Sequence, residues 1–123
     1  MRHWLALLSV AVVLCTALHG AIAAETCPNC GKIHATSGAE RYVVNRDPRA
    51  YAHALKEARI LASRHSAGHP LGVAPGCRYS GTGYSYGIRP HHCYYGEISE
   101  SRLVARACVR GRNGALFWSA HYR

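Results

Sequence analysis

The clearest structural signal in this chain is residues 47–68, which read DPRAYAHALKEARILASRHSAG. Asp47 is suited to accept hydrogen bonds from the first amides of a helix, and Pro48 loses no hydrogen bond at the first helical position. Apolar or large side chains then recur at steps of three and four, namely Tyr51, Ala54, Leu55, Ala58, Leu61, Ala62 and His65. This spacing is typical of one face of an amphipathic helix. Because Gly68 and Pro70 end the pattern, we predict a helix over residues 48–66.

Two strands are predicted after this helix, near the C-terminus. Residues 103–110 and 115–123 flank a four-residue connection that ends in Asn113-Gly114, which is typical of a hairpin turn. Between helix and hairpin, residues 68–90 are rich in Gly, Pro, Ser and Tyr and favour at most one short strand, whose glycines allow close backbone approach. The order predicts an α+β fold, with one long amphipathic helix packed on a small antiparallel sheet ending in a C-terminal hairpin.

One face of the last predicted strand carries Trp118 together with Leu116, Ala120 and Tyr122. We expect Trp118 to pack against the helix, at Leu55, Leu61 or their neighbours. We expect the single small domain to span residues 41–123, preceded by a Cys/Gly-rich tail over residues 25–40.

Residues 1–24 resemble a secretory signal peptide. A basic start at residues 1–3 precedes an apolar run over 4–14, and residues 21–23 supply a small-x-small pattern, so we expect cleavage after Ala23 or Ala24. The alternative is a membrane anchor, but polar residues and Gly20 interrupt the run before it reaches the ~20 residues of a bilayer span. Lipidation of Cys15 is a third interpretation. It is disfavoured because Leu14 occupies the position before the cysteine, where a lipoprotein signal needs a small residue.

The signal peptide predicts an exported protein, secreted or periplasmic, with no membrane span after cleavage. The whole chain has 123 residues and a formal charge of +9, and removing Arg2 with the signal lowers the charge by one, to +8. Arginine dominates and suits forked contacts with carboxylates, phosphates or sulfates. The arginines are spread along the chain and no nucleic-acid reading element accompanies them, so we expect a solvated surface with some attraction for polyanions and no specific nucleic-acid partner.

Five cysteines remain after cleavage, and an exported protein can form disulfides. We expect a disulfide between Cys77 and Cys93, which closes a short loop, with Cys108 outside the pair. The alternative pairing joins Cys93 to Cys108.

The tail carries a possible metal site in Cys27-Pro28-Asn29-Cys30-Gly31-Lys32-Ile33-His34. Two thiolates and an imidazole at this spacing are able to bind one zinc ion, and the motif is similar to half of a zinc ribbon. Only Cys77 or the run His91-His92-Cys93 offers further ligands. A redox dithiol or a local disulfide are the alternatives.

Outside the tail, His69, just after the helix, is the histidine best placed to belong to a functional site. His53 and Glu57 lie one helical turn apart and can pair. Tyr84 belongs to a cluster of tyrosines, with Gly and Arg among them, that favours a ligand-binding surface or, alternatively, packs a small sheet. The sequence contains no Ser-His-Asp pattern, nucleophile elbow, phosphate loop or spaced pair of carboxylates. We therefore predict no catalytic residue and no enzyme.

The order of these segments resembles part of the CAP superfamily, the cysteine-rich secretory and pathogenesis-related proteins. The resemblance spans residues 48–123 and rests on the Ala-rich helix, Gly68-His69, residues 81–85 and the closing hairpin at 116–122. It implies an exported α–β–α-like fold with a surface cavity, in a family that mostly binds small lipids, ions or other proteins, with His69 as a cavity histidine. The family's Gly-Glu-Asn box and its helix with a second His and Glu are absent, and the chain is shorter.

Two functional hypotheses follow. The first is an exported, non-enzymatic binding or structural domain, a reduced CAP-like module, whose partner is a small ligand or a polyanionic surface. The second is a zinc-binding protein that uses Cys27, Cys30 and His34.

Overall fold

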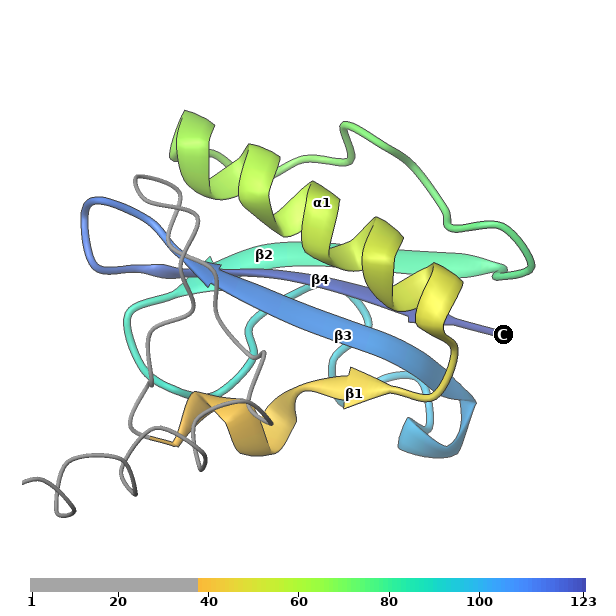
Figure 1. The fold of residues 1–123 in the computed structure, drawn as a ribbon. Helices are drawn as coiled ribbons and strands as arrows, with labels where there is room; N and C mark the ends of the chain where they lie inside the picture. Colours follow the sequence, from red (N-terminus) through yellow and green to blue (C-terminus); the bar gives the residue numbers. More distant parts are fainter. Residues whose placement is uncertain (1–37) are drawn as a thin grey trace, which may run out of the picture.

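The computed structural model describes residues 38–123, which form one α-helix packed on a four-stranded antiparallel sheet (Figure 1). The expected α+β fold with its C-terminal hairpin is confirmed. In chain order the elements are the 3-10 helix η1 (Ala39–Tyr42), β1 (Val44–Asn45), α1 (Pro48–Arg64), β2 (Tyr79–Ser85), the 3-10 helix η2 (Glu100–Arg102), β3 (Leu103–Arg110) and β4 (Leu116–Tyr122). Within this range no helix has both the length and the apolar character needed to cross a bilayer.

Helix α1 begins at Pro48, as its sequence predicts. The Asp47 carboxylate accepts hydrogen bonds from the amides of Arg49, at 3.0 Å, and Ala50, at 3.2 Å. The helix ends at Arg64, slightly before the expected residue 66, because His65 adopts a left-handed conformation with φ 50°. Local capping chemistry thus sets both ends of the helix.

The sheet has the strand order β1-β3-β4-β2, so β4 lies between β3 and β2. β3 and β4 form the predicted hairpin, and Gly114 supplies the positive φ of 83° in its turn. β2 pairs with β4 along its whole length, from Tyr79 opposite Tyr122 to Ser85 opposite Leu116. Every residue of β4 is buried, so this strand must be covered on both faces.

Helix α1 covers one face of the sheet through its alanines. Ala50 and Ala54 pack with Ala105 and Ala107 of β3, and further along the helix a second cluster of small and apolar residues contains Ala58, Leu61, Ala62, Val109 and Phe117. Side chains this small let the helix axis approach the sheet closely. Phe117, Ser119 and His121 therefore face α1.

The opposite face of β4 carries Trp118, and here the expected packing is wrong. Trp118 is fully buried, but it packs with Ala39 of η1, Cys108 and Ile88 rather than with Leu55 or Leu61. Its indole Nε1 donates to Ser85 Oγ at 3.0 Å. Strand alternation predicted which residues share a face, but both faces of β4 are buried, so alternation did not tell which face the helix covers. Among the described residues, Ala39 packs in the core although it belongs to the segment expected to be tail.

The segment after β2 crosses this second face close to the strand. A Cβ at Gly81 would collide with the carbonyl oxygen of Cys93, and a Cβ at Gly83 would collide with that of His91. Only glycine leaves room for the two backbones, which confirms the close approach expected for the glycines of this region. Residues 86–102 and η1 thus cover the face that α1 leaves open (Figure 1).

Replacing Trp118 by Ala is expected to lower the free energy of unfolding by about 3–5 kcal/mol, the usual cost of truncating a buried aromatic side chain. Urea unfolding followed by circular dichroism measures this loss. Tyr86→Ala, at a side chain that is 73% exposed, serves as the control and should change stability by less than about 0.5 kcal/mol. A loss below about 1 kcal/mol for Trp118→Ala would contradict the buried position of the indole.

Candidate functional site

A buried polar cluster joins α1 to β4. Glu57, Ser119 and His121 are each fully buried. The Ser119 hydroxyl donates to Glu57 Oε2 at 2.8 Å, and His121 Nε2 lies 3.2 Å from Ser119 Oγ and 3.7 Å from Glu57 Oε2. The amide of Leu71 donates to the other carboxylate oxygen of Glu57 at 3.2 Å. One carboxylate therefore links the helix, the loop after it and the central strand.

The proton positions in this cluster do not suit hydrolysis. The amide of Ala74 donates to His121 Nδ1 at 3.2 Å, so the neutral ring carries its proton on Nε2, the nitrogen that faces Ser119. A catalytic serine needs the reverse, a bare imidazole nitrogen that accepts the hydroxyl proton. Ser119 instead donates to Glu57, and neither side chain is exposed. We interpret the cluster as a structural link between helix and sheet.

Two further histidines surround His121. The His53 ring meets that of His121 edge-on at 5.1 Å, and its Nε2 hydrogen-bonds to the Gly72 carbonyl at 3.0 Å instead of pairing with Glu57. Burial lowers the pKa of His121 to about 4, and repulsion from His53 and His69 acts in the same direction. The imidazole is therefore neutral near pH 7.

The sequence-predicted ligand residues His69 and Tyr84 do not meet. His69 is exposed, and its Nδ1 lies 3.3 Å from Ser80 Oγ, at the start of β2. Tyr84 is 45% exposed at the other end of the strand, where its ring packs on Phe117 at 5.8 Å. Four steps of extended strand lead from Ser80 to Tyr84, a distance of about 13 Å. His69 and Tyr84 are therefore too far apart to bind one small ligand together.

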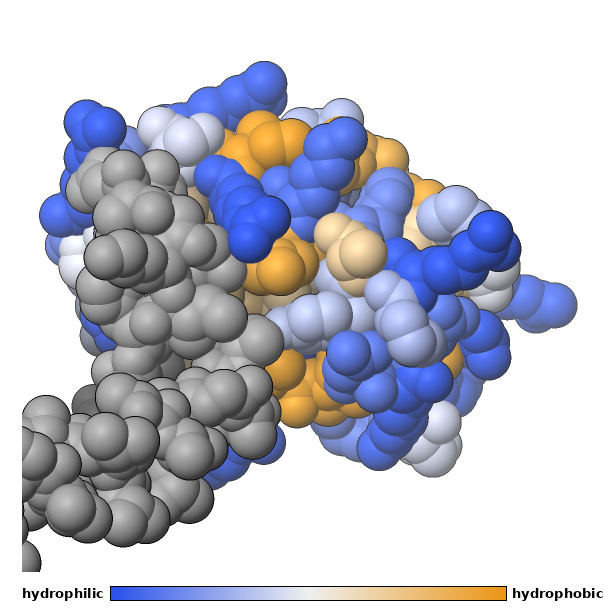
Figure 2. All heavy atoms as spheres, in the orientation of Figure 1, coloured by the Kyte–Doolittle hydropathy of each residue, from blue (hydrophilic) through white to orange (hydrophobic). Residues whose placement is uncertain are grey.

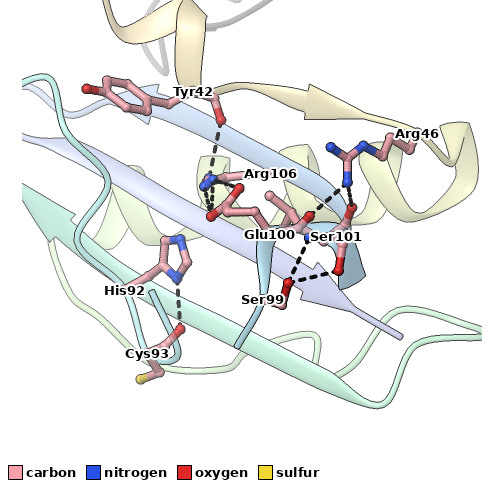
Figure 3. Close-up of polar contacts among 9 residues, drawn as sticks. Tyr42, Arg46, His92, Cys93, Ser99, Glu100, Ser101 and Arg106 are labelled. Atoms are coloured by element: carbon pink, nitrogen blue, oxygen red, sulfur yellow. Dashed lines mark hydrogen bonds and ion pairs between the residues drawn. The ribbon is translucent and has the colours of Figure 1, made fainter. Parts of the chain in front are cut away.

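A second polar cluster lies on the face opposite α1, around Arg106 of β3 (Figure 3). Arg106 is 2% exposed, and its terminal nitrogens bond to the Glu100 carboxylate at 2.9 and 3.0 Å. Its Nε donates to the Tyr42 carbonyl at 3.2 Å. The bidentate contact compensates the buried guanidinium charge, while the Glu100 side chain remains 54% exposed. This ion pair ties η1, η2 and β3 together.

His92 and Tyr122 lie next to this ion pair. His92 Nδ1 bonds to the Cys93 carbonyl at 2.8 Å, and its other nitrogen points toward Glu100 and Arg106 (Figure 3). Among residues 38–123, neither His92 Nε2 nor the Tyr122 hydroxyl has a hydrogen-bond partner, although both atoms are buried. Burial lowers the pKa of His92 to about 4 and raises that of Tyr122 to about 12.

Above this cluster, aromatic rings and guanidinium groups meet at the surface. Tyr79, Tyr94 and Tyr95 are each between 36% and 38% exposed. The Arg102 guanidinium lies over the Tyr79 ring at 5.3 Å, and Tyr79 meets Tyr94 edge-on at 5.7 Å. The Arg106 guanidinium lies over Tyr95, also at 5.3 Å. We call Tyr79, Tyr94, Tyr95 and Arg102 the tyrosine–arginine surface.

The expected disulfide between Cys77 and Cys93 is not formed in this structure, and neither is the alternative between Cys93 and Cys108. Cys77 packs with the apolar cluster under α1, whereas Cys93 crosses the other face of the sheet, over Gly81. The strand β2 separates the two thiols, which explains why closing a short loop did not bring them together.

The expected zinc ligands Cys27, Cys30 and His34 lie outside the described residues, so that site remains a prediction, tested by metal analysis of the purified protein. Within residues 38–123 no three side chains of His, Cys, Asp or Glu are arranged to hold a metal ion. The additional ligands considered, His91, His92 and Cys93, adopt different environments: His92 is buried, while its two neighbours are exposed.

Comparison of the chain with protein-family models, curated proteins and solved structures gave no match in any of the three. The resemblance to the CAP superfamily therefore stays an expectation that rests on the quoted residues alone. In the described part of the chain a helix covers one face of the sheet, and the other face is covered by residues 86–102 and η1.

Sequence reasoning named Glu57 only as a partner for His53 and did not single out Arg106, although these two residues organise the clusters. Glu57 lies on the apolar stripe of α1, between Ala54 and Leu61, and a carboxylate at that position signals a buried partner. Arg106 lies in the middle of an otherwise apolar strand, which is the same kind of signal. Their partners Ser119 and Glu100 come from elements that only the folded chain brings close.

The free energy of unfolding should fall when the pH is lowered from about 6.5 toward 4. The unfolded chain binds protons at the ordinary histidine pKa of 6.5, whereas His92 and His121 in the fold resist protonation until about pH 4. The stability is therefore complete above pH 6.5, and we expect a loss of about 2–3 kcal/mol for each imidazole as the pH approaches 4.

Urea unfolding across this pH range measures the loss. His121→Asn should reduce the pH dependence, whereas His91→Asn, at an exposed position, should preserve it. Equal pH dependence in the two variants would show that His121 titrates normally in the fold.

Proposed function

We propose that this protein is an exported, non-enzymatic binding domain that holds an anionic partner on its tyrosine–arginine surface. The observation that carries the proposal is the stacking of Arg102 on Tyr79 beside two further half-exposed tyrosines. Tyrosine and arginine are the side chains most often found at the centre of binding surfaces. Export is supported by the signal-like residues 1–24.

The Arg102 guanidinium is oriented so that it can bind an anion. Its Nε donates to the Arg123 carbonyl, which orients the guanidinium over the tyrosine ring. Its two terminal nitrogens make no hydrogen bond to any residue in 38–123. A planar guanidinium with free donors along one edge matches a carboxylate, sulfate or phosphate group.

The charge of the whole chain supports an anionic partner without specifying where it binds. The formal charge is +9, and on the face drawn in Figure 2 the hydrophilic side chains are spread out rather than gathered in one patch. Such a distribution accelerates encounter with polyanions and gives little selectivity. The tyrosine–arginine surface adds rigid rings and an oriented donor at one place, which favours selective binding there.

The cluster of Glu57, Ser119 and His121 under α1 does not have the arrangement that hydrolysis requires, which favours a binding function. Ser119 lies beside both an imidazole and a carboxylate, yet its hydroxyl donates a hydrogen bond to Glu57 and is shielded from solvent. A catalytic role would require an accessible nucleophile and a base able to accept its proton.

Arg102→Gln should weaken binding to two carboxylate polymers, polygalacturonate and polyglutamate, by about tenfold each, the effect of losing a charge-assisted contact. Fluorescence anisotropy with labelled polymers at low and at physiological salt measures the change. Arg64→Gln removes the same charge from the exposed end of α1 and should change the affinity by less than about twofold. Equal losses in the two variants, or no binding of either polymer, would overturn the proposed function.

A further inference from the structure

Two buried polar atoms beneath the tyrosine–arginine surface have no partner in the described chain. His92 is 8% exposed and Tyr122 is fully buried, and their rings lie 6.4 Å apart. No hydrogen bond joins His92 Nε2 to the Tyr122 hydroxyl, and neither atom has another partner within residues 38–123. A buried polar atom without a partner is costly, so a pair of them points to a group that completes both.

The hydrogen-bonding capacity of each atom defines that group. A carbonyl oxygen only accepts, so the contact between His92 Nδ1 and the Cys93 carbonyl places the ring proton on Nδ1. His92 Nε2 is therefore a lone pair that needs a donor. The Tyr122 hydroxyl has a proton to give and can also accept. The missing group must donate to His92 and accept from Tyr122.

The charged groups beside the two atoms do not call for an ion. Arg106 and Glu100 form an ion pair with each other, so their charges compensate and leave no net charge for a bound ion to neutralise. An uncharged hydroxyl group satisfies both atoms, because it donates one hydrogen bond and accepts another.

Tyr95 connects this buried pair to the surface. Its ring is 38% exposed and meets the His92 ring edge-on at 5.4 Å, while Arg106 lies over the same ring. An exposed aromatic face next to a hydroxyl-binding pair suits a sugar ring, which presents an apolar face and several hydroxyl groups. The Tyr95 ring therefore lies between the exposed surface and the buried pair.

We propose that His92 and Tyr122 form a subsite for a sugar hydroxyl, so that the anionic partner of the tyrosine–arginine surface is an acidic polysaccharide. The inference rests on the proposed function and names its ligand class. Arg102 binds a carboxylate or sulfate of the polymer, Tyr95 packs on a sugar ring, and a hydroxyl of that ring bridges His92 and Tyr122.

The segment over the subsite must move to admit the ligand. Residues 93–97 are exposed, and Tyr94 and Gly96 adopt positive φ values of 69° and 79°. The amide of Cys93 is held to the Thr82 carbonyl by a long hydrogen bond of 3.4 Å. The other backbone hydrogen bonds of this segment, from Tyr95 to His92 and from Glu97 and Ile98 to Tyr94, are internal to it and can be kept while it moves.

The test compares two polymers that carry carboxylates, of which only one has hydroxyl groups. The wild-type protein should bind polygalacturonate more tightly than polyglutamate, and Tyr122→Phe should weaken polygalacturonate binding by about threefold to tenfold while leaving polyglutamate unchanged. Tyr86→Phe removes a hydroxyl at the other, exposed end of β2 and should leave both affinities unchanged.

Folding of the variant is checked separately. Because the Tyr122 hydroxyl has no partner in the described chain, Tyr122→Phe should keep or raise the urea midpoint of unfolding. The His92 Nε2 resonance in nitrogen-15 spectra should shift on addition of polygalacturonate and not of polyglutamate.

The outcomes separate the two proposals. Equal affinity for the two polymers, unchanged by Tyr122→Phe, would overturn the sugar subsite while Arg102→Gln still tests the anionic surface. A lower urea midpoint for Tyr122→Phe with an unchanged polymer preference would show that the pair holds only a buried water. Failure of both polymers to bind would overturn the proposed function itself.

Discussion

Burial of β4 on both faces is the constraint on which the rest of this structure depends. The strand lies between β3 and β2, and each of its residues is shielded from solvent. The one helix of the described chain can cover a single face, so the segment between β2 and β3 must cover the other. Gly81 and Gly83 make this possible, because they let the backbone of residues 91–93 lie directly on β2. The loop is thus part of the core and not an appendage to it.

Each face is held by a buried polar side chain that joins distant segments. Under the helix, Glu57 connects α1 with Ser119 and with the amide of Leu71. On the other face, Arg106 connects η1 with Glu100 of η2. A buried polar or charged group that loses its partner is costly, so such contacts favour one arrangement of helix, loop and sheet over its alternatives. A core made largely of alanines has few large side chains to provide that specificity.

The two faces differ in what they can offer a ligand. On the helix side the polar atoms of Glu57, Ser119 and His121 satisfy one another, which leaves nothing for a substrate. On the loop side His92 and Tyr122 lack partners, and half-exposed tyrosines with an oriented arginine lie above them. The segment that covers the second face therefore combines a structural role with the surface best suited to binding.

The sequence alone determined the elements whose signals are local. The Asp47-Pro48 cap with its three-and-four spacing predicted α1, Asn113-Gly114 predicted the hairpin, and the glycines of β2 indicated a close backbone approach. Alternation also sorted β4 correctly into two sets of residues. Only the tertiary structure decided which set faces the helix, because both sets are buried and nothing local distinguishes them. Phe117 packs under α1, and Trp118, which was expected there, lies on the opposite face. The partners of Glu57, Arg106 and the cysteines were likewise decided by long-range packing, since residues far apart in the chain become neighbours only when the sheet and its two coverings have formed.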